Sequence, residues 1–383
     1  MTGAGRGTRR VRRSSTGALR GRVPGPAAEC AGGCRAPSFL LPPSALLTLG
    51  RQVLVNNWVG TPITYTLDPV GNRTYMKDPD GHYWTYEWDA DGGLRTVWNS
   101  YNQTTTLTHD PLGREVQRVL ADGVSVNRTF DAAGRETTLQ AVDAAGAALS
   151  GYTATYDPVG NRLTVLELDG TRVTYTHDAA NQLTREQRGG AHPIDGTMQY
   201  DGVGNRVSKV DATGTTSYQV NAANELVLTT PPTGAPTTST WDADGNLAVE
   251  NTGGQLTTHT WDTDNRLLRI DKPDGTWETN TYRADGLRSS HEDTDGLVYF
   301  VLDGQNVLLE KNSSKVRRAI YTQLPGIWGG AFSYRRGADH YYLLPDFQGH
   351  TRQLTNAAGA IFEPHIYVSV KPSPRSLRRL ASG

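Results

Sequence analysis

The nine residues YDPVGNRLT at 156–164 return as YDGVGNRVS at 200–208 and, more loosely, as WDADGNLAV at 241–249. Each copy has an aromatic residue, then an acid, with a glycine three positions after the acid and an asparagine after the glycine. A phrase that recurs at a regular spacing is typical of a repeat architecture. The fold therefore follows from what this phrase does to the backbone.

The acidic position of the phrase recurs through most of the chain, about every 21 residues. Three residues after each copy stands Gly or Asn, the two residue types that best tolerate a positive φ. The aligned positions are Asp68, Asp89, Asp110, Asp131, Asp157, Asp178, Asp201, Asn221, Asp242, Asp262 and Arg283, followed by Gly71, Gly92, Gly113, Gly134, Gly160, Asn181, Gly204, Asn224, Gly245, Asn265 and Gly286. This agreement indicates a repeated backbone requirement.

Turn chemistry accounts for the requirement. Asp first, often Pro second, and Gly fourth is typical of a type I turn followed by a left-handed residue, which closes a hairpin with a bulge. A second signal lies between the copies, because Asp-Gly pairs flanked by strand-like residues predict tight type I′ hairpins. These pairs are Asp80-Gly81, Asp122-Gly123, Asp169-Gly170 and Asp274-Gly275. Each repeat is then strand, turn, strand, turn.

The strands alternate as a half-buried sheet requires. Trp84, Tyr86 and Trp88 share one face while Thr85 and Glu87 share the other. Eleven such units predict roughly twenty-two short antiparallel strands. A meander of that length must twist, and its open edges favour wrapping. The predicted fold class is therefore all-β, a long hairpin meander that coils into a β-solenoid or spiral shell, a partial cocoon.

Composition narrows the function. The 383 residues carry a formal net charge of -1, which favours neither nucleic acid nor an acidic membrane as a partner. No apolar run is long enough to predict a membrane span. Cys30 and Cys34 have no neighbouring histidine, so they predict no metal site. Residues 1–55 form a basic leader that we expect to be disordered, and they do not have the layout of a secretory signal.

The aromatic-Asp-x-x-Gly phrase resembles the YD repeat of the Rhs family, which also includes teneurins and the cocoon components of bacterial insecticidal toxin complexes. Two further passages carry the resemblance. YFVLDGQNVLLE at 299–310 resembles a strand of that family, and HYYLLPDFQGHTRQLTNAAGAIFE at 340–363 resembles the opening of the Rhs-associated core. The resemblance covers about residues 60–365. It divides the chain into a leader (1–55), a YD-repeat sheet (56–298), a core-like segment (299–367) and a basic tail (368–383).

The resemblance implies a spiral shell that encloses a C-terminal polymorphic toxin in toxin members, and an extracellular binding module in teneurin-like members. Toxin members end the core with an Asp-Pro-x-Gly-Leu-type stretch at which an aspartyl-protease-like site releases the effector. After Tyr367 this sequence reads VSVKPSPRSLRRLASG, without that stretch. Self-cleavage is therefore not carried over. We expect a truncated core whose effector is encoded elsewhere.

Few residues suggest chemistry. Asp89-x-Asp91, Asp242-x-Asp244 and Asp262-x-Asp264 resemble calcium loops but lack the later ligands, so turn chemistry is the preferred interpretation. No nucleophile, zinc-protease or P-loop spacing is present. A histidine group near Asp339 and Asp346 would be the one candidate for acid–base chemistry. Its members are His340, His350 and His365. We predict no catalytic, cofactor-binding or metal-binding residues, and no cofactor.

Three functions follow. The first is a non-catalytic structural shell segment of a secreted or cell-surface bacterial protein, which encloses or presents an effector. The second is an extracellular module that binds carbohydrate or a cell-surface partner through its Trp and Tyr rings, unless those rings form the sheet's own ladder. The third, least favoured, is a glycan-processing enzyme. The group Arg317, Arg318, Arg335 and Arg336 is interpreted as a solvated strand face.

Overall fold

The computed structural model describes residues 54–55, 62–326 and 330–364, and these contain thirty β-strands. The first fifteen are β1 Leu54–Val55, β2 Ile63–Leu67, β3 Arg73–Lys77, β4 Tyr83–Trp88, β5 Leu94–Asn99, β6 Gln103–His109, β7 Glu115–Val119, β8 Ser125–Phe130, β9 Glu136–Val142, β10 Ala148–Tyr156, β11 Arg162–Glu167, β12 Arg172–His177, β13 Leu183–Arg188, β14 Ile194–Tyr200 and β15 Arg206–Asp211. The others are β16 Gly214–Val220, β17 Leu226–Thr230, β18 Thr237–Trp241, β19 Leu247–Thr252, β20 Gln255–Trp261, β21 Leu267–Asp271, β22 Trp277–Tyr282, β23 Arg288–Asp293, β24 Gly296–Asp303, β25 Asn306–Asn312, β26 Arg317–Gln323, β27 Ala331–Arg336, β28 Asp339–Pro345, β29 Thr351–Asn356 and β30 Ile361–Pro364.

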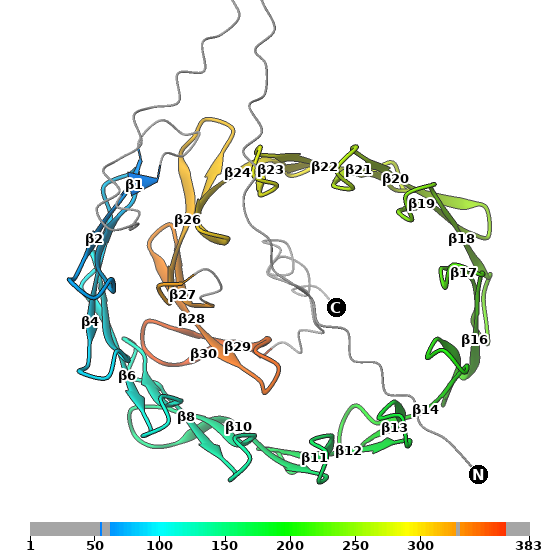
Figure 1. Ribbon diagram of the computed structural model, residues 1–383, viewed down its shortest axis with the longest axis horizontal. Helices are drawn as coiled ribbons and strands as arrows, with labels where there is room; N and C mark the ends of the chain where they lie inside the picture. Colours follow the sequence, from blue (N-terminus) through cyan, green and yellow to red (C-terminus); the bar gives the residue numbers. More distant parts are fainter. Residues whose placement is uncertain (1–53, 56–61, 327–329, 365–383) are drawn as a thin grey trace, which may run out of the picture. The chain divides into compact units, whose positions relative to one another are not determined.

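The strands form one antiparallel sheet in which each strand pairs with those directly before and after it in sequence. The predicted all-β meander is confirmed. It runs further than the roughly twenty-two strands expected, because the core-like segment from 299 onward is also built from hairpins, β24 to β30. The sheet coils, so that β2 to β24 make a wall and β26 to β30 lie on its inner side (Figure 1).

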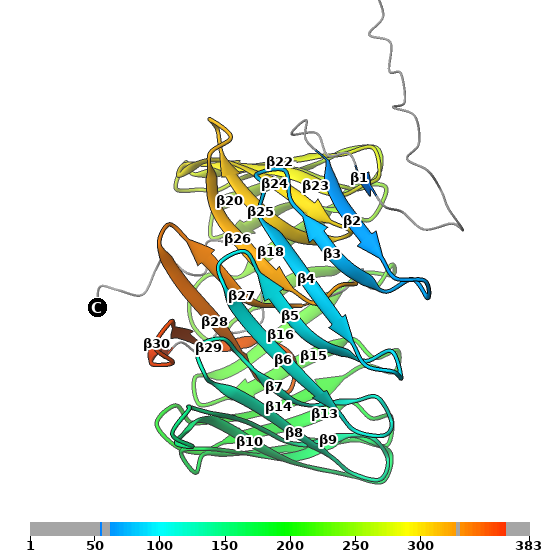
Figure 2. The same cartoon turned by 90° about the vertical axis from the view of Figure 1, so that its left-hand side faces the viewer.

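The coil brings together strands far apart in sequence. Figure 2 shows β2 to β6 beside β24 to β28, and side-chain contacts join the two groups. Trp84 Nε1 donates to Thr322 Oγ1 at 3.3 Å, and Gln103 Nε2 donates to the Tyr342 hydroxyl at 2.7 Å. We call this contact between the first wall strands, β2 to β10, and the later strands, β24 to β29, the seam.

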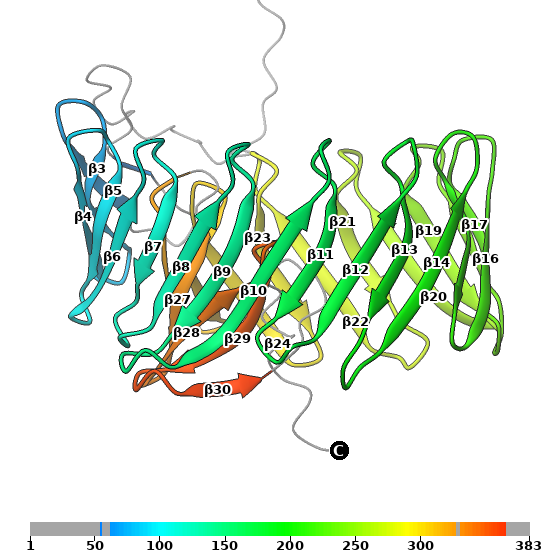
Figure 3. The same ribbon diagram turned by 90° about the horizontal axis from the view of Figure 1, so that it is seen from below.

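All eleven predicted left-handed positions are confirmed, since Gly71 through Gly286 in the aligned series have positive φ. At Asp157 the turn closes with Gly160 N donating to Asp157 O and Asp157 N donating to Asn161 O, at 3.2 and 2.9 Å. The register shifts between Thr155 and Tyr156, which is the expected bulge. The turns lie at the two ends of the strands, along the upper and lower rims of the wall (Figure 3).

The predicted type I′ hairpins are wrong. At Asp80-Gly81 only Gly81 has a positive φ, and the closing bonds join Asp78 N to His82 O and Gly81 N to Asp78 O. This is the same turn as in the phrase, with Asp80 in its third position. A type I′ turn would need a positive φ at a residue with a side chain as well, which the type I turn with a left-handed glycine avoids.

The same turn also recurs where the alignment did not place it. Among the described residues it closes at Asp143–Gly146, Asn312–Lys315, Asp346–Gly349 and Asn356–Gly359. The signal was present, because Asp or Asn is followed three positions later by Gly in three of the four. The regular spacing did not reveal the turn at Asp143, because this residue falls inside the single long interval between Asp131 and Asp157.

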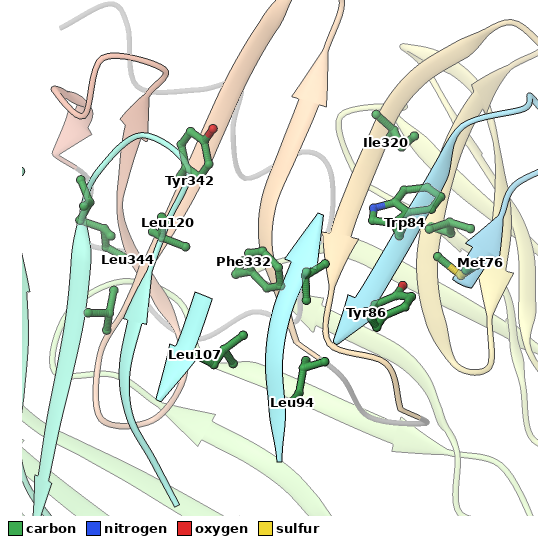
Figure 4. Close-up of a cluster of buried hydrophobic side chains, with 14 of the residues drawn as sticks. Met76, Trp84, Tyr86, Leu94, Leu107, Leu120, Ile320, Phe332, Tyr342 and Leu344 are labelled. Atoms are coloured by element: carbon green, nitrogen blue, oxygen red, sulfur yellow. The ribbon is translucent and has the colours of Figure 1, made fainter. Parts of the chain in front are cut away.

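The principal core lies at the seam. Figure 4 shows Trp84, Tyr86 and Met76 on the wall packed against Ile320 and Phe332 of the later strands. The predicted alternation of β4 is confirmed, because Trp84 and Tyr86 are buried whereas Glu87 is exposed. A smaller cluster of Ala154, Val165 and Val173 extends the core along the inner face of the wall.

Replacing Gly160 with Val tests the turn. A β-carbon at Gly160 would meet nothing within 4 Å, so the cost is backbone strain alone, about 1–3 kcal/mol. Asn at the same place should cost less, because Asn181 holds φ 63 in the equivalent turn. Urea unfolding of both variants checks this, and equal stability of wild type and the Val variant would contradict the assigned turn.

Candidate functional site

Where the aromatic residue of the phrase is Tyr or Trp, its side chain forms a hydrogen bond with the repeat before it. Tyr156 Oη donates to Glu136 O at 2.6 Å, and Trp261 Nε1 donates to Leu247 O at 2.8 Å. In both cases the acceptor is the first residue of the strand directly before it in the sheet. The same bond recurs in four further pairs: Trp88 with Arg73, Tyr200 with Leu183, Trp241 with Leu226, and Tyr282 with Leu267. These rings therefore stabilise the sheet by joining one repeat to the next.

Replacing Tyr156 with Phe should cost about 0.5–1.5 kcal/mol, the usual net contribution of a hydrogen bond. The ring should stay in place, because Phe130 occupies the equivalent position and has Arg114 stacked over it at 4.4 Å. Thermal unfolding measures the loss. A variant as stable as wild type would mean that the Glu136 carbonyl is satisfied by water.

The residue four positions after the acid completes the phrase. Asn205 Nδ2 donates to Asp201 Oδ2 within its own turn and to Asn224 Oδ1 of the next one, at 2.9 Å in each case. Where this residue is arginine, its guanidinium lies over the aromatic ring of the following repeat, as Arg135 does over Tyr156 at 4.9 Å. The aromatic residue, the acid, the glycine and the residue after the glycine thus serve the turn or the neighbouring repeat.

The turn carboxylates have lowered pKa values. The Asn205 side-chain amide donates to Asp201 and holds its pKa below the ordinary 3.8, and backbone N–H groups add to this. The backbone N–H of Arg135 does the same for the pKa of Asp131. Hydrogen bonds led by the Thr213 hydroxyl bring the pKa of Asp211 to about 2. These acids are used structurally, which leaves them poorly suited to proton transfer near neutral pH.

Acid should therefore destabilise the protein. A carboxyl whose folded pKa is depressed stabilises the fold above its ordinary pKa, and that stability is lost as pH falls. The window here runs from about 3.8 down to about 2. Melting temperatures measured from pH 7 to 2 should fall steeply in that window. Asp201→Asn should flatten the slope and keep the turn, because Asn221 Oδ1 accepts the N–H groups of Ala223 and Glu225.

A buried ion pair joins the beginning of β3 to the end of β24 across the seam. Asp303, the last residue of β24, accepts hydrogen bonds from both terminal guanidinium nitrogens of Arg73, with Nη1–Oδ2 at 2.5 Å and Nη2–Oδ1 at 3.0 Å. The Tyr65 hydroxyl donates to Asp303 Oδ1 at 2.8 Å, and burial together with Asp303 raises the pKa of Tyr65. The Asp303 side chain is only 3% exposed. Sequence reasoning missed this site, because its members lie 230 residues apart.

A second polar group lies further along the seam. His82 Nδ1 is 3.0 Å from Asp78 Oδ2, and Arg317 contacts the other side of the ring. The buried Lys311 pairs with Asp80 from the same turn. These contacts join the turn between β3 and β4 to β25 and β26, so charged side chains hold the seam on either side of its apolar core.

The candidate histidine group does not assemble. His340 stands at the start of β28 against the Tyr101 ring, with centroids 5.4 Å apart, and burial beside Arg335 lowers its pKa to about 4. His350 stands beyond the other end of β28, in the turn with Asp346. His365 lies outside the described residues, as do Cys30 and Cys34. The pair that can be placed cannot share a proton.

The arginine group is not the solvated face expected. Arg335 lies 4.4 Å from the Tyr101 ring centroid, Arg317 contacts His82, and Arg336 pairs with the buried Glu310 at 3.4 Å. All are partly buried because the inner strands pack against the wall.

The acids of the calcium-like passages bind the backbone of their own turns. Asp89 Oδ1, for example, accepts a hydrogen bond from Gly93 N at 2.7 Å. In the described part of the chain no three His, Cys, Asp or Glu residues gather as metal ligands would.

No family model and no curated protein matches the sequence. Among solved structures, a chain of the Photorhabdus luminescens Tc holotoxin pore carrying a TccC3-D651A mutation superposes with a TM-score of 0.61 at 17% identity. The similarity covers 80% of this chain and 17% of that one. The protein has the fold of an Rhs-type shell. The expectation drawn from the YD-like phrase is therefore confirmed for the fold.

A crystal structure of TcdB2-TccC3 is also similar, with a TM-score of 0.38 and 12% identity over 82% of this chain and 24% of that one. The chain thus spans about a fifth of the length of these two similar chains. Within the described residues, no helix is long and apolar enough to cross a membrane. The turn acids, the rings of the phrase and the seam contacts are the residues that build this fold.

Proposed function

We propose that the chain is a non-catalytic wall segment of a secreted or cell-surface shell that encloses an effector encoded elsewhere, and that the C-terminal side of the segment faces the enclosed space. The observation that carries this proposal is the path of the chain. After one circuit of wall, β26 to β30 continue on the inner side of the coil, and β30 is the last described strand (Figure 1). Figure 3 places β30 at the lower rim of the wall, so a polypeptide that continues from β30 starts at that rim, on the inner side of the coil.

The chemistry of the wall supports a structural role. Its turn acids accept hydrogen bonds from backbone N–H groups, and each of its two charged seam groups joins the beginning of the wall to a later strand. The second hypothesis, carbohydrate binding through rows of rings, has less support, because the polar atoms of six rings already bind backbone carbonyls of neighbouring repeats. A glycan-processing activity has less support, because the candidate histidines near Asp339 and Asp346 do not come together: His340 and His350 stand at opposite ends of β28.

Protease accessibility tests the proposal. One variant carries a site for a specific protease after Pro364, at the end of β30, and a matched variant carries the same site between Gly253 and Gly254, in the exposed turn between β19 and β20. We expect cleavage after Pro364 to be at least tenfold slower in the native protein and equal in both after denaturation. Equal native rates would overturn the enclosed position of the C-terminal side.

A further inference from the structure

A cavity of about 770 Å³ opens where three turns of the coil meet. The turns are 68–72 between β2 and β3, which contributes Gly71 and Asn72, 283–287 between β22 and β23, and 304–305 between β24 and β25, together with the last two residues of β24. The first belongs to the beginning of the wall and the other two to its end, so the cavity exists only because the coil closes on itself. It lies next to the Arg73–Asp303 pair.

The turn at 283–287 is the one that departs from the phrase. Ten of the eleven aligned positions hold Asp or Asn, and the eleventh holds Arg283. The backbone is unchanged, since Gly286 N donates to Arg283 O at 3.0 Å and Gly286 has φ 81. The carboxylate has moved to Asp285, whose Oδ1 accepts Leu287 N at 3.2 Å. The turn therefore does not require a cation at this position, and the presence of Arg283 needs another explanation.

Arg283 lines the cavity. Leu67, Leu287 and Leu302 supply apolar lining together with the Trp88 ring, which is fixed by its bond to Arg73 O at 2.8 Å. Of the two arginines that line the cavity, Arg73 is held by the buried Asp303. Arg283 pairs through Nη2 with Asp285, a side chain that is 44% exposed. A guanidinium has five N–H donors, so one such contact leaves donors for a second carboxylate.

We propose that this cavity binds a small carboxylate with an aliphatic or aromatic body. Its carboxylate binds the Arg283 guanidinium in the paired geometry that such groups favour, and its body packs on Trp88 and the leucines. The proposal goes beyond the shell function, because a ligand that contacts 68–72 and 283–287 together would bind only when the seam is closed.

Two probes isolate the carboxylate. N-acetyl-leucine and N-acetyl-leucinamide have the same body, and only the first carries the negative charge. Titration of each into the full chain, followed by calorimetry and by the indole N–H resonance of Trp88, should show saturable binding of the acid. The amide should bind at least tenfold more weakly. Equal binding of both, or no saturable binding of the acid, would overturn the proposal.

Substitution at 283 can be made without harm to the turn. Arg283→Asn copies the turn at Asn221, and Arg283→Asp copies the other nine. Both should keep the wild-type melting temperature and lower the affinity for N-acetyl-leucine at least tenfold. Arg185→Asn, which alters the exposed pair with Asp195, should leave the affinity unchanged. Full affinity in the Arg283 variants would overturn the assignment. The protease test of the shell reads a different property, so the two proposals fail independently.

Discussion

Replacing Asp303 with Ala is expected to destabilise the protein by about 3–5 kcal/mol, the usual cost of removing one partner from a buried ion pair. The cost arises because Arg73 and the Tyr65 hydroxyl would lose their partner. Arg73, whose side chain is 18% exposed, would keep its charge beside the Tyr65 and Tyr86 rings without a counter-ion. The Tyr65 hydroxyl would also lose its acceptor. Urea unfolding should show the loss as a lower midpoint.

A matched control separates burial from pairing. Asp195→Ala removes one partner of a similar arginine pair, with Arg185, but that carboxylate is 55% exposed. Exposed pairs contribute roughly 0–1 kcal/mol, so this variant should remain close to wild type. The double variant Arg73→Met with Asp303→Leu should recover much of the lost stability. If the Asp303 and Asp195 variants lose the same amount, the seam pair is not a buried one.

The Trp84→Ala variant should lose about 3–5 kcal/mol as well, because a large buried ring leaves a cavity that its neighbours fill only in part. Trp84 is 1% exposed and packs between the wall and the inner strands, with its Nε1 on Thr322 (Figure 4). The loss should also separate the inner strands from the wall. Hydrogen exchange should therefore speed up in β26 and β27 more than in β18 and β19.

Trp98 provides the control for this second substitution. It lies on the neighbouring strand β5, is half-buried, and packs against Tyr83 on the opposite face, with ring centroids 5.4 Å apart. Trp98→Ala should cost roughly 1 kcal/mol, as is typical of a change outside the core. It should not alter exchange in β26. Equal costs for the two tryptophans would mean that the inner strands do not cover the wall.

The turns and the strand order could be predicted from the sequence because both are local. A positive φ at Gly71 or Asn181 depends on a four-residue segment, and consecutive hairpins leave little choice of neighbour. The type I′ error at Asp80 was local too. Asp-Gly suits both turns, and the position of the closing bonds decides between them.

The seam could not be predicted, because nothing near Arg73 in sequence indicates Asp303. The alternation of β4 marked Trp84 as buried but left its partner open. The histidines show the opposite error. His340 and His350 are close in sequence, yet a strand of seven residues separates them in space. Closeness along the chain predicts contact only within a turn or between adjacent strands.

The separation of the seam partners has a consequence for how the molecule forms during synthesis. Each wall hairpin can close as soon as its own residues emerge, because its pairing is local. Trp84 must wait for Thr322, which lies 238 residues later. Until then the apolar face of β3 to β6 is exposed beside the open edge of a growing sheet, a state that favours aggregation. We therefore expect the early repeats to be the part of the nascent chain most prone to aggregation.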